Sequence, residues 1–363
     1  MRSVLEKLLS QAFEAKASDL HLKANSRAMI RIYGQMKDIS EKVFSQEEIK
    51  KMCQSILNQN QLEQLSENFD IDAGYSLLNT CRFRVNIYHD INGMGAVFRA
   101  IPFQIKSMDE IGLPDIATDL LSREQGLILV TGPTGSGKST TLAAMVDNIN
   151  QSQKKHIITI EDPLEYVHQD KMSIINQREV GTDVDSFDNA LLSILRQDPD
   201  MILVGEMRNL ETIKMTLTAA ETGKLVIATL HTTNAMQTAE RIVNVFPKNQ
   251  QQQVLTQLSI VIQGIISQTL LLKIDNSGRV AAFEVMVADA AMKNLIKEGK
   301  FHQIQSYIEA GKEKGMQTLD MALAELVKKR IIAKNSALDA SQNPMQLEQL
   351  LDPTRPAITR TRR

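Results

Sequence analysis

The sequence predicts an α/β protein in which a small α+β domain precedes a larger domain built on a parallel sheet. Two observations support this division. In the first hundred residues, short segments that alternate apolar and polar residues stand beside helical repeats, whereas from Leu113 onward nearly continuous apolar strands alternate with helices. Alternation is typical of a sheet with one solvated face, and apolar strands separated by helices are typical of a parallel sheet covered on both faces.

The composition limits the classes of function. A chain of 363 residues with a net charge of −2 suits two or three domains and gives no electrostatic argument for nucleic acid binding. Cys53 and Cys81 are the only cysteines, so neither a disulfide framework nor a four-cysteine zinc site can be built. No apolar stretch reaches the ~18 residues of a spanning helix, and the charged N-terminus is no secretion signal. We therefore expect a cytoplasmic protein.

The first domain is expected to span residues 1–100. Apolar periodicity predicts helices at 3–16 and 46–66, and period-two alternation predicts strands at 18–22, 29–33, 82–88 and 96–100. In the strand at 82–88 the apolar side chains of Phe83, Val85 and Ile87 face one way, and the polar side chains of Arg82, Arg84 and Asn86 face the other.

The remaining boundaries follow from breaks in the pattern. Pro102 lacks a backbone donor and restricts the residue before it, so we expect a linker over 101–112. The second domain should cover 113–289, with strands at 127–131, 156–161, 201–205 and 225–229, and the chain after Pro247 reads as mostly helical. A helical C-terminal region is expected at 290–338, and a disordered tail at 339–363.

A phosphate-binding loop is the clearest motif in the sequence. Residues 132–139 read G-x-x-x-x-G-K-S, between an apolar strand and a helix that opens near Thr140. Backbone N–H groups of such a loop cradle phosphate oxygens at a helix N-terminus. Lys138 should reach the β- and γ-phosphates, and the Ser139 hydroxyl should bind Mg²⁺. The predicted nucleotide contacts, with ATP and Mg²⁺ as ligands, are Gly132, Pro133, Thr134, Gly135, Ser136, Gly137, Lys138, Ser139 and Thr140.

Two further strands end in carboxylates at the sheet edge where such proteins bind ligands. Glu161 begins the segment Glu161-Asp162-Pro163-Leu164-Glu165, whose carboxylates suit a Mg²⁺ second shell or orientation of the attacking water; helix capping by Asp162 and Glu165 is an equal alternative. Glu206 follows an apolar strand and Gly205. A carboxylate there can orient or deprotonate water, and a strand-end carboxylate without such a task would be costly. We therefore favour catalysis for Glu206.

His231 and three arginines complete the set of candidate residues. His231 leaves a strand just before a helix that Asn234 should cap. A lone histidine is more often a core group, but its place at the same sheet edge suggests a sensor that contacts the γ-phosphate or Glu206. Arginines supplied by another domain or subunit stabilise transition-state charge, worth roughly 10³–10⁵ in rate. Arg84 and Arg99 are predicted to complete the nucleotide site in this way, and Arg82 is the next candidate. The alternative is that these arginines form an ordinary solvated face of the strand.

These segments together resemble one known family. The loop 132–139 and the segments 158–165, 202–208 and 229–233 resemble, in that order, the phosphate loop, Asp box, Walker B box and His box of the secretion ATPase superfamily. Within it the chain is most similar to type IV pilus retraction ATPases. The segments 18–22, 219–223, 266–271 and 315–320 also resemble that group, and the resemblance covers about residues 1–338.

The resemblance implies a fold, an activity and partners. It implies a PAS-like N-terminal domain, a RecA-like ATPase domain and a homohexameric ring. It further implies a cytoplasmic motor that docks on an inner-membrane pilus platform protein, where ATP hydrolysis drives pilus retraction and twitching motility. An accessory retraction ATPase is a possible partner, and nucleic acid is not expected.

The retraction motif of that group departs from its usual form here. Its typical sequence, Ala-Ile-Arg-Asn-Leu-Ile-Arg-Glu, appears as Ala-Met-Lys-Asn-Leu-Ile-Lys-Glu at 291–298. The apolar positions predict a helix at 290–298 with Asp289 as its N-cap. That helix either packs as ordinary core or transmits the ATP-driven movement to the pilus machinery.

Three other functions remain as alternatives. An accessory retraction-ATPase paralogue would act mainly as a nucleotide-gated binding partner. A pilus-extension or secretion ATPase usually carries an extra N-terminal domain and a four-cysteine zinc insert, which two cysteines cannot supply. A nucleic acid translocase with a RecA core is disfavoured by the balanced charge.

Overall fold

The computed structural model describes residues 1–32, 34–77, 81–101 and 105–352, which divide into two compact units. The first unit contains Met1–Gln104 together with the short segments Asp162–His168 and Arg178–Asp185. The second contains Ile105–Glu161, Gln169–Gln177 and Ser186–Arg363. The sequence placed both short segments in the ATPase core, because periodicity carries no information on contacts with residues distant in sequence. The predicted break at Pro102-Phe103 lies outside the described residues.

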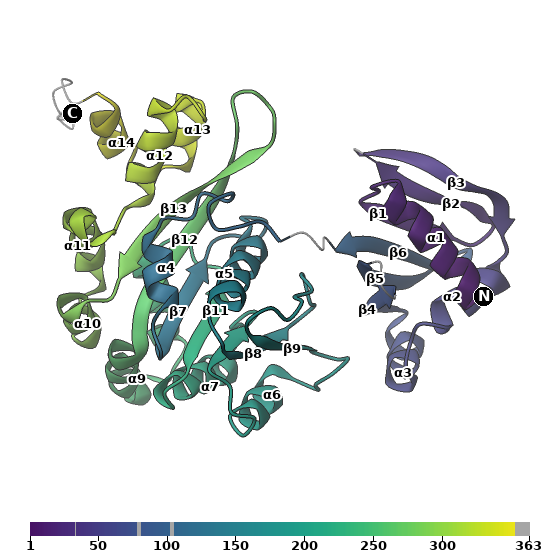
Figure 1. Ribbon diagram of the computed structural model, residues 1–363, viewed down its shortest axis with the longest axis horizontal. Coiled ribbons are helices and arrows are strands. Elements are labelled where there is room, and N and C mark those ends of the chain that lie inside the picture. Colours follow the sequence, from purple (N-terminus) through teal and green to yellow (C-terminus); the bar gives the residue numbers. More distant parts are fainter. Residues whose placement is uncertain (33, 78–80, 102–104, 353–363) are drawn as a thin grey trace. The chain divides into compact units, whose positions relative to one another are not determined.

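The first unit is a six-stranded antiparallel sheet in the order β3-β2-β1-β6-β5-β4, packed on one face by α1 and α2 (Figure 1). Its elements are α1 (Arg2–Glu14), β1 (Asp19–Lys23), β2 (Ser26–Ile32), β3 (Gln35–Phe44), α2 (Gln46–Gln54), α3 (Gln59–Asn68), β4 (Asp70–Leu77), β5 (Cys81–Asp90) and β6 (Gly93–Ile101). The single helix predicted at 46–66 is wrong. Two capping boxes, Ser45 with Glu48 and Asn58 with Gln61, start separate helices there.

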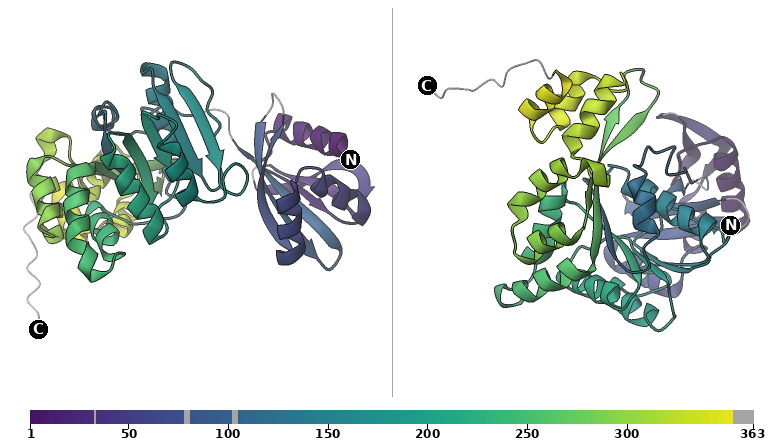
Figure 2. Two further views of the ribbon diagram at one scale, coloured as in Figure 1. Left: turned by 90° about the horizontal axis from the view of Figure 1, so that it is seen from below. Right: turned by 60° about the vertical axis from the view of Figure 1, so that its left-hand side comes forward.

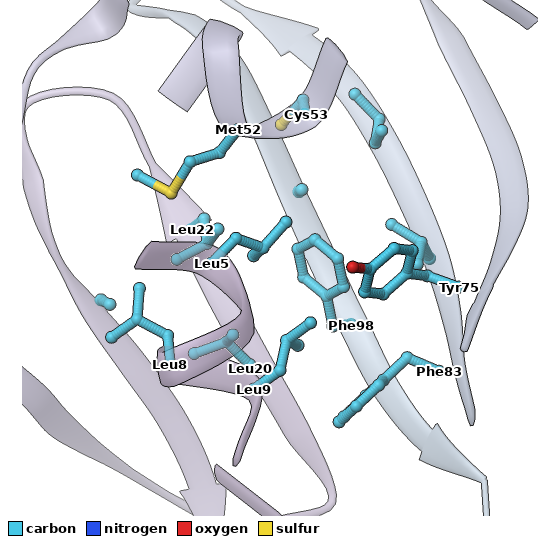
Figure 3. Close-up of a cluster of buried hydrophobic side chains, with 14 of the residues drawn as sticks. Leu5, Leu8, Leu9, Leu20, Leu22, Met52, Cys53, Tyr75, Phe83 and Phe98 are labelled. Atoms are coloured by element: carbon cyan, nitrogen blue, oxygen red, sulfur yellow. The ribbon is translucent and has the colours of Figure 1, made fainter. Parts of the chain in front are cut away.

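Apolar side chains from α1 and α2 pack against one face of this sheet (Figure 3). The rings of Phe83 and Phe98 meet edge to face with their centroids 6.5 Å apart. Burial raises the pKa of both Cys53 and Cys81 to about 12, so both thiols stay protonated at neutral pH. The labelled members of the cluster are Leu5, Leu8, Leu9, Leu20, Leu22, Met52, Cys53, Tyr75, Phe83 and Phe98.

The second unit is built on a seven-stranded sheet in the order β13-β12-β7-β11-β10-β8-β9 (Figures 1 and 2). The strands are β7 (Gly126–Thr131), β8 (His156–Glu161), β9 (Ile174–Glu179), β10 (Met201–Val204), β11 (Leu225–Leu230), β12 (Ile262–Leu272) and β13 (Arg279–Val287). Neighbours from β12 to β8 pair in parallel, and every residue of β7, β10 and β11 is buried. The predicted parallel sheet covered on both faces is therefore confirmed.

Helices cover this sheet and continue beyond it. They are α4 (Ile116–Leu121), α5 (Lys138–Ser152), α6 (Phe187–Ile194), α7 (Leu210–Glu221), α8 (Ala235–Asn244), α9 (Lys248–Val261), α10 (Ala290–Lys297), α11 (Ile304–Ala310), α12 (Leu319–Lys328), α13 (Lys334–Ala340) and α14 (Pro344–Leu351). The last three form a hydrophobic cluster of their own with the ends of β12 and β13, drawn in yellow and green in Figure 2. Within the ranges that the structure describes, no helix has the length and apolarity needed to cross a bilayer.

Two expectations for the C-terminal half are corrected. The chain after Pro247 contains the helices α9 to α14, as expected, but two strands that were not predicted interrupt them, because β12 and β13 form a long antiparallel hairpin. Their apolar runs are ambiguous between a buried strand and a buried helix when read from periodicity alone. Residues 339–351 are not a disordered tail: Asn343 caps α14, Pro344 occupies its first turn and Leu347 is buried. Proline suits the first turn of a helix as well as it suits a loop. Residues 353–363 of the predicted tail lie outside the described residues.

Candidate nucleotide-binding and catalytic site

A glycine turn joins β7 to α5 at the carboxyl edge of the parallel strands. Gly132, Gly135 and Gly137 have φ angles of +146°, +78° and +92°, a region that side chains with a Cβ rarely adopt. A Cβ on Gly132 would collide with the Gln268 carbonyl oxygen and lie 2.6 Å from Ser136 Oγ. Gly137 is the N-cap of α5, so the loop ends at a helix N-terminus. This is the geometry that a phosphate-binding loop needs.

Lys138 and Ser136 show how well the loop fits a phosphate. Lys138 Nζ donates to the carbonyl oxygens of Gly132 at 2.7 Å and Pro133 at 3.1 Å. Within the described part of the chain, the buried Ser136 hydroxyl has no hydrogen-bond partner. Burial lowers the pKa of Lys138, while Glu206 acts in the opposite direction. Charged phosphate oxygens are stronger acceptors than carbonyl groups, so a phosphate would satisfy both side chains better than the loop does.

The other predicted loop contacts lie around this centre. Pro133 and Thr134 are exposed on the turn, and Ser139 and Thr140 are half-buried in the first turn of α5. Their contacts with ATP and Mg²⁺ stay predictions.

Glu206 and His231 are in direct contact beside the loop. His231 Nε2 lies 2.5 Å from Glu206 Oε1, and Lys138 Nζ lies 3.2 Å from His231 Nδ1. Arg208 Nε donates to the second carboxylate oxygen of Glu206 at 2.8 Å. The three side chains Lys138, His231 and Glu206 therefore form a continuous polar chain from the phosphate-binding loop to the end of β10. The contact that we predicted between His231 and Glu206 is present; a sensing role stays a prediction.

Backbone contacts between β10 and β11 fix this arrangement. Thr229 Oγ1 donates to the Gly205 carbonyl oxygen at 2.5 Å, and the Met207 N–H donates to the Thr229 carbonyl oxygen at 3.0 Å. The two bonds join Gly205 and Met207, which flank Glu206, to Thr229, which lies two residues before His231. They therefore limit how far Glu206 and His231 can move apart.

Glu161 lies at the neighbouring strand end. Thr159 Oγ1 donates to Glu161 Oε1 at 2.8 Å. A Cβ on Gly205, the residue after β10, would lie 3.2 Å from Glu161 Cα, so a side chain there would push the two strand ends slightly apart. Glu161 and Glu206 thus emerge from adjacent strands at one sheet edge, as predicted, and the alternative roles of Glu161 stay open.

Comparison with known proteins identifies a family that spans most of the chain. The family model described as type II/IV secretion system protein matches residues 1–343. The chain belongs to this family.

Two relatives and one solved structure are similar to this family member along nearly their whole lengths. The twitching motility protein of Neisseria gonorrhoeae is 46% identical over 341 residues, which cover 94% of this chain and 91% of that protein. The type IV pilus retraction ATPase PilT of Pseudomonas aeruginosa is 47% identical over 335 residues, which cover 92% and 97%. A crystal structure of the pilus retraction motor PilT with bound ADP is 44% identical, covers 95% and 99%, and has a TM-score of 0.87. The predicted resemblance to pilus retraction ATPases is confirmed.

Gln268 is a site residue that the sequence analysis missed. This buried amide of β12 accepts from Thr141 Oγ1 at 2.7 Å and donates to the Ser136 carbonyl oxygen at 2.5 Å. It therefore holds both the phosphate-binding loop and the start of α5. The segment that contains it, 266–271, is identified in the sequence only by its resemblance to the family. The signal that could have identified Gln268 is a polar side chain inside an apolar strand, where burial without a hydrogen-bond partner is costly.

We expect Gln268→Leu to weaken nucleotide binding about tenfold and to lower the melting temperature. The leucine fills the space but leaves the Ser136 carbonyl and the Thr141 hydroxyl unpaired, at a cost of about 1–3 kcal/mol per buried group. Titration with ADP and thermal unfolding measure both effects. Gln263→Leu on the same strand is the matched control, because Gln263 bonds to Gln125 and Arg123 instead of the loop. Equal ADP affinity in the two variants would contradict a role for Gln268.

The arginines of the first unit differ in their surroundings. Arg84 and Arg99 lie directly opposite each other on β5 and β6, so they share one face of the sheet. Arg99 Nε donates to Asp19 Oδ1 at 2.9 Å, and Arg84 has only longer contacts with Asp72 and Glu165, at 3.8 and 3.9 Å. Arg82 instead pairs with the buried carboxylate of Glu179, which favours a structural role for Arg82. The action of Arg84 and Arg99 on a nucleotide stays a prediction.

A buried glutamate lies behind the His231 loop. Glu284 of β13 accepts a hydrogen bond at 2.7 Å from the Ala235 N–H at the start of α8, and Asn234 caps that helix as predicted. Burial raises the pKa of Glu284 to about 7, while the backbone groups of Ala235 and Leu319 lower it. The start of α8, four residues after His231, is thereby held on β13.

Proposed function

We propose that this protein is a Mg²⁺-dependent ATPase that drives type IV pilus retraction. The observation that carries the proposal is the polar chain from Lys138 through His231 to Glu206 at the mouth of an intact phosphate-binding loop. Similarity to PilT over nearly its whole length supports retraction as the work that the hydrolysis performs.

Each group in the site has a distinct task in this proposal. The loop backbone and Lys138 hold the β- and γ-phosphates, and the Ser139 hydroxyl holds Mg²⁺, which neutralises developing phosphate charge. Glu206 orients the attacking water and accepts its proton. His231 fixes one oxygen of Glu206 and responds to the γ-phosphate. Glu161, on the adjacent strand, supports the metal or the water.

The assembly in this proposal is a cytoplasmic homohexamer at the inner face of the cytoplasmic membrane. Arg84 and Arg99 complete the nucleotide site, and the ring acts on a pilus platform protein, with an accessory retraction ATPase as a further partner. Arg84→Ala should then bind ATP and hydrolyse it poorly.

Removal of Mg²⁺ should abolish turnover while leaving part of the nucleotide affinity. The loop backbone and Lys138 still contact phosphate without the metal, but the charge that builds up in the transition state is no longer neutralised. Phosphate release measured with and without EDTA checks this, and restoration by excess MgCl₂ is the control. Full turnover in EDTA would contradict a metal-dependent mechanism.

Deletion of the gene tests the cellular function. Loss of a retraction motor should give cells with excess surface pili and no twitching motility, whereas loss of an extension motor should give cells without pili. A protein that hydrolyses little ATP by itself but is required for the work of a second ATPase would favour the accessory paralogue. Stimulation by single-stranded nucleic acid would favour a translocase.

A further inference from the structure

A row of buried polar side chains crosses three neighbouring strands of the second unit, β13, β12 and β7 (Figure 1). Glu284 on β13 lies opposite Ser267 on β12, and Ser267 lies opposite Thr131 on β7. Paired residues of neighbouring strands share one face of a sheet, and these three are at most 1% exposed. Thr131 directly precedes Gly132, so this buried polar row begins at the phosphate-binding loop.

The two ends of the buried polar row hold different segments of the site. At one end Thr131 Oγ1 donates to Ser267 Oγ at 2.8 Å, which ties the start of the phosphate-binding loop to β12. At the other end Glu284 Oε1 accepts from the Ala235 N–H at 2.7 Å. Ala235 is the first residue of α8 and lies four residues after His231. The segment that carries His231 is therefore tied to β13, the partner strand of β12.

The segment after His231 is itself bonded to the first turn of α8. The Asn234 side chain accepts from the Gln237 N–H at 2.8 Å, and Thr232 Oγ1 lies 2.6 Å from Thr238 Oγ1. Side-chain bonds of this kind fix the chain just before a helix to the helix start. A shift of the start of α8 would therefore be passed on to His231.

Glu284 is a costly residue for a purely structural contact. Its Oε2 atom is buried and has no hydrogen-bond partner among the residues that the structure describes. Burial raises the pKa of Glu284 to about 7, the Ala235 and Leu319 backbone groups lower it, and Asp320 raises it. An apolar side chain of similar size would fill the position without the cost of burying a carboxyl group. The carboxyl group therefore needs an explanation other than stability.

We infer that Glu284 is a positioning residue for catalysis: it fixes the start of α8 on β13 and thereby keeps His231 in contact with Glu206. This rests on the proposed function, in which His231 fixes one oxygen of Glu206, and it adds a residue that touches neither nucleotide nor water. His231 Nε2 lies 2.5 Å from Glu206 Oε1. Misplacement of such a group by about 1 Å can cost up to ~10² in rate, so one hydrogen bond that fixes the helix start has a measurable effect.

Steady-state ATPase kinetics on the assembled full-length protein test the inference with two substitutions of Glu284. Glu284→Leu removes the acceptor for the Ala235 N–H, and we expect kcat to fall about tenfold. KM for ATP and the affinity for ADP should stay nearly unchanged, because the phosphate-binding loop and Lys138 keep their contacts. Glu284→Gln keeps one acceptor oxygen and should recover most of the lost kcat.

Removal of the donor gives an independent test of the same bond. Ala235→Pro lacks the N–H group that Glu284 accepts, and proline suits the first position of a helix. The preceding residue, Asn234, already has the extended backbone that a following proline requires. Ala235→Pro should therefore fold and should reproduce the low kcat of Glu284→Leu.

The melting temperature separates positioning from plain stabilisation. Glu284→Leu removes a buried carboxyl group and also leaves one N–H group unpaired, and these two effects on stability oppose each other. We expect the melting temperature to change little while kcat falls. Val285→Ala is the matched control, because Val285 is fully buried on the opposite face of the same strand. It should lower the melting temperature and leave kcat near normal.

A double variant tests whether Glu284 acts through His231. His231→Ala should be slow by itself, because it removes the contact with Glu206. Glu284→Leu combined with His231→Ala should be no slower than His231→Ala alone, since a misplaced His231 and a missing one have the same consequence.

Several outcomes would overturn the inference. Normal kcat in Glu284→Leu beside a slow His231→Ala would remove Glu284 and leave the proposed function intact. A loss of kcat matched by a loss of thermal stability, or effects that add fully in the double variant, would show a general structural role for Glu284. If Glu284→Gln is as slow as Glu284→Leu, or if Ala235→Pro is normal, the bond to Ala235 is not the relevant contact. Normal kcat in His231→Ala would contradict the role of His231 in the proposed function itself.

Discussion

Replacing Glu206 by glutamine is expected to leave nucleotide binding intact and to stop turnover. The Glu206 side chain is 19% exposed and bonded to His231 and Arg208, so its position is fixed before any ligand binds. The amide keeps the shape and one acceptor oxygen, but its NH2 group cannot accept the second hydrogen bond and it cannot accept a proton from water. General-base catalysis contributes typically about 10²–10⁴ in rate, and we expect a loss of that order.

Lys138→Ala should differ from Glu206→Gln by weakening nucleotide binding as well as turnover. This change removes the ammonium group that lies inside the loop, so affinity for ADP and ATP should fall together with turnover. ADP titration and phosphate release distinguish the two variants. Glu211→Gln, an exposed glutamate at the start of α7, is the matched control and should behave as the unaltered protein does. A Glu206→Gln protein that hydrolyses ATP at the normal rate would remove this residue from the reaction.

The positions of these groups follow from local patterns in the sequence. The strands β7, β8, β10 and β11 are continuous apolar runs, and in a parallel sheet their carboxyl ends meet at one edge. That rule alone predicts that Glu161, Glu206 and His231 lie at the same edge of the sheet. The helix starts at Asn234 and Asp289 were also predictable, since capping involves only three or four neighbouring residues.

Features that depend on distant contacts were not predictable in this way. Gln268 bonds to Ser136 across 132 positions of the chain, and Asp19 bonds to Arg99 across 80. The hairpin of β12 and β13 is stabilised by pairing between two apolar runs, each of which also suits a buried helix. The Asn343-Pro344 pair has the same ambiguity, because it begins a helix as readily as it ends one.

The helix α10 carries the retraction-type motif, and its apolar positions divide between two surroundings. Met292 and Ile296 are fully buried. Ala291, Asn294 and Leu295 instead line a groove of about 560 Å³ that α10 shares with α11. The helix therefore has a packed face, as the structural interpretation requires, and a second, more open face.

The two lysines of the motif have different surroundings. Lys293 Nζ donates at 3.1 Å to the Ile260 carbonyl oxygen in the last turn of α9. Burial lowers the pKa of Lys293, with a smaller effect of Arg123. A lysine at a helix C-terminus satisfies a free carbonyl and interacts favourably with the helix dipole. Lys297 is exposed at the end of α10 and has a weaker structural role. Reversing both charges together would mix a packing defect with a surface change.

Lys297→Glu is expected to keep the fold and the assembly, to leave ATPase activity within about twofold of normal, and to abolish pilus retraction. Surface substitutions away from special contacts change stability by about 0.5 kcal/mol or less, and Lys297 is distant in sequence from every phosphate-contacting segment. Lys293→Glu should instead destabilise the protein, because its carboxylate would face the negative end of α9. Lys334→Glu, at the exposed start of α13, is the matched control and should retain retraction.

Three measurements on the same set of variants separate coupling from structure. Thermal unfolding and assembly identify packing defects, phosphate release reports hydrolysis, and counting surface pili with twitching motility reports the mechanical output. A Lys297→Glu protein that folds and hydrolyses ATP, in cells that fail to retract pili, would show that α10 couples ATP hydrolysis to pilus retraction. Normal retraction in those cells would contradict a coupling role for Lys297. Loss of assembly in Lys297→Glu would favour the ordinary structural interpretation of this helix.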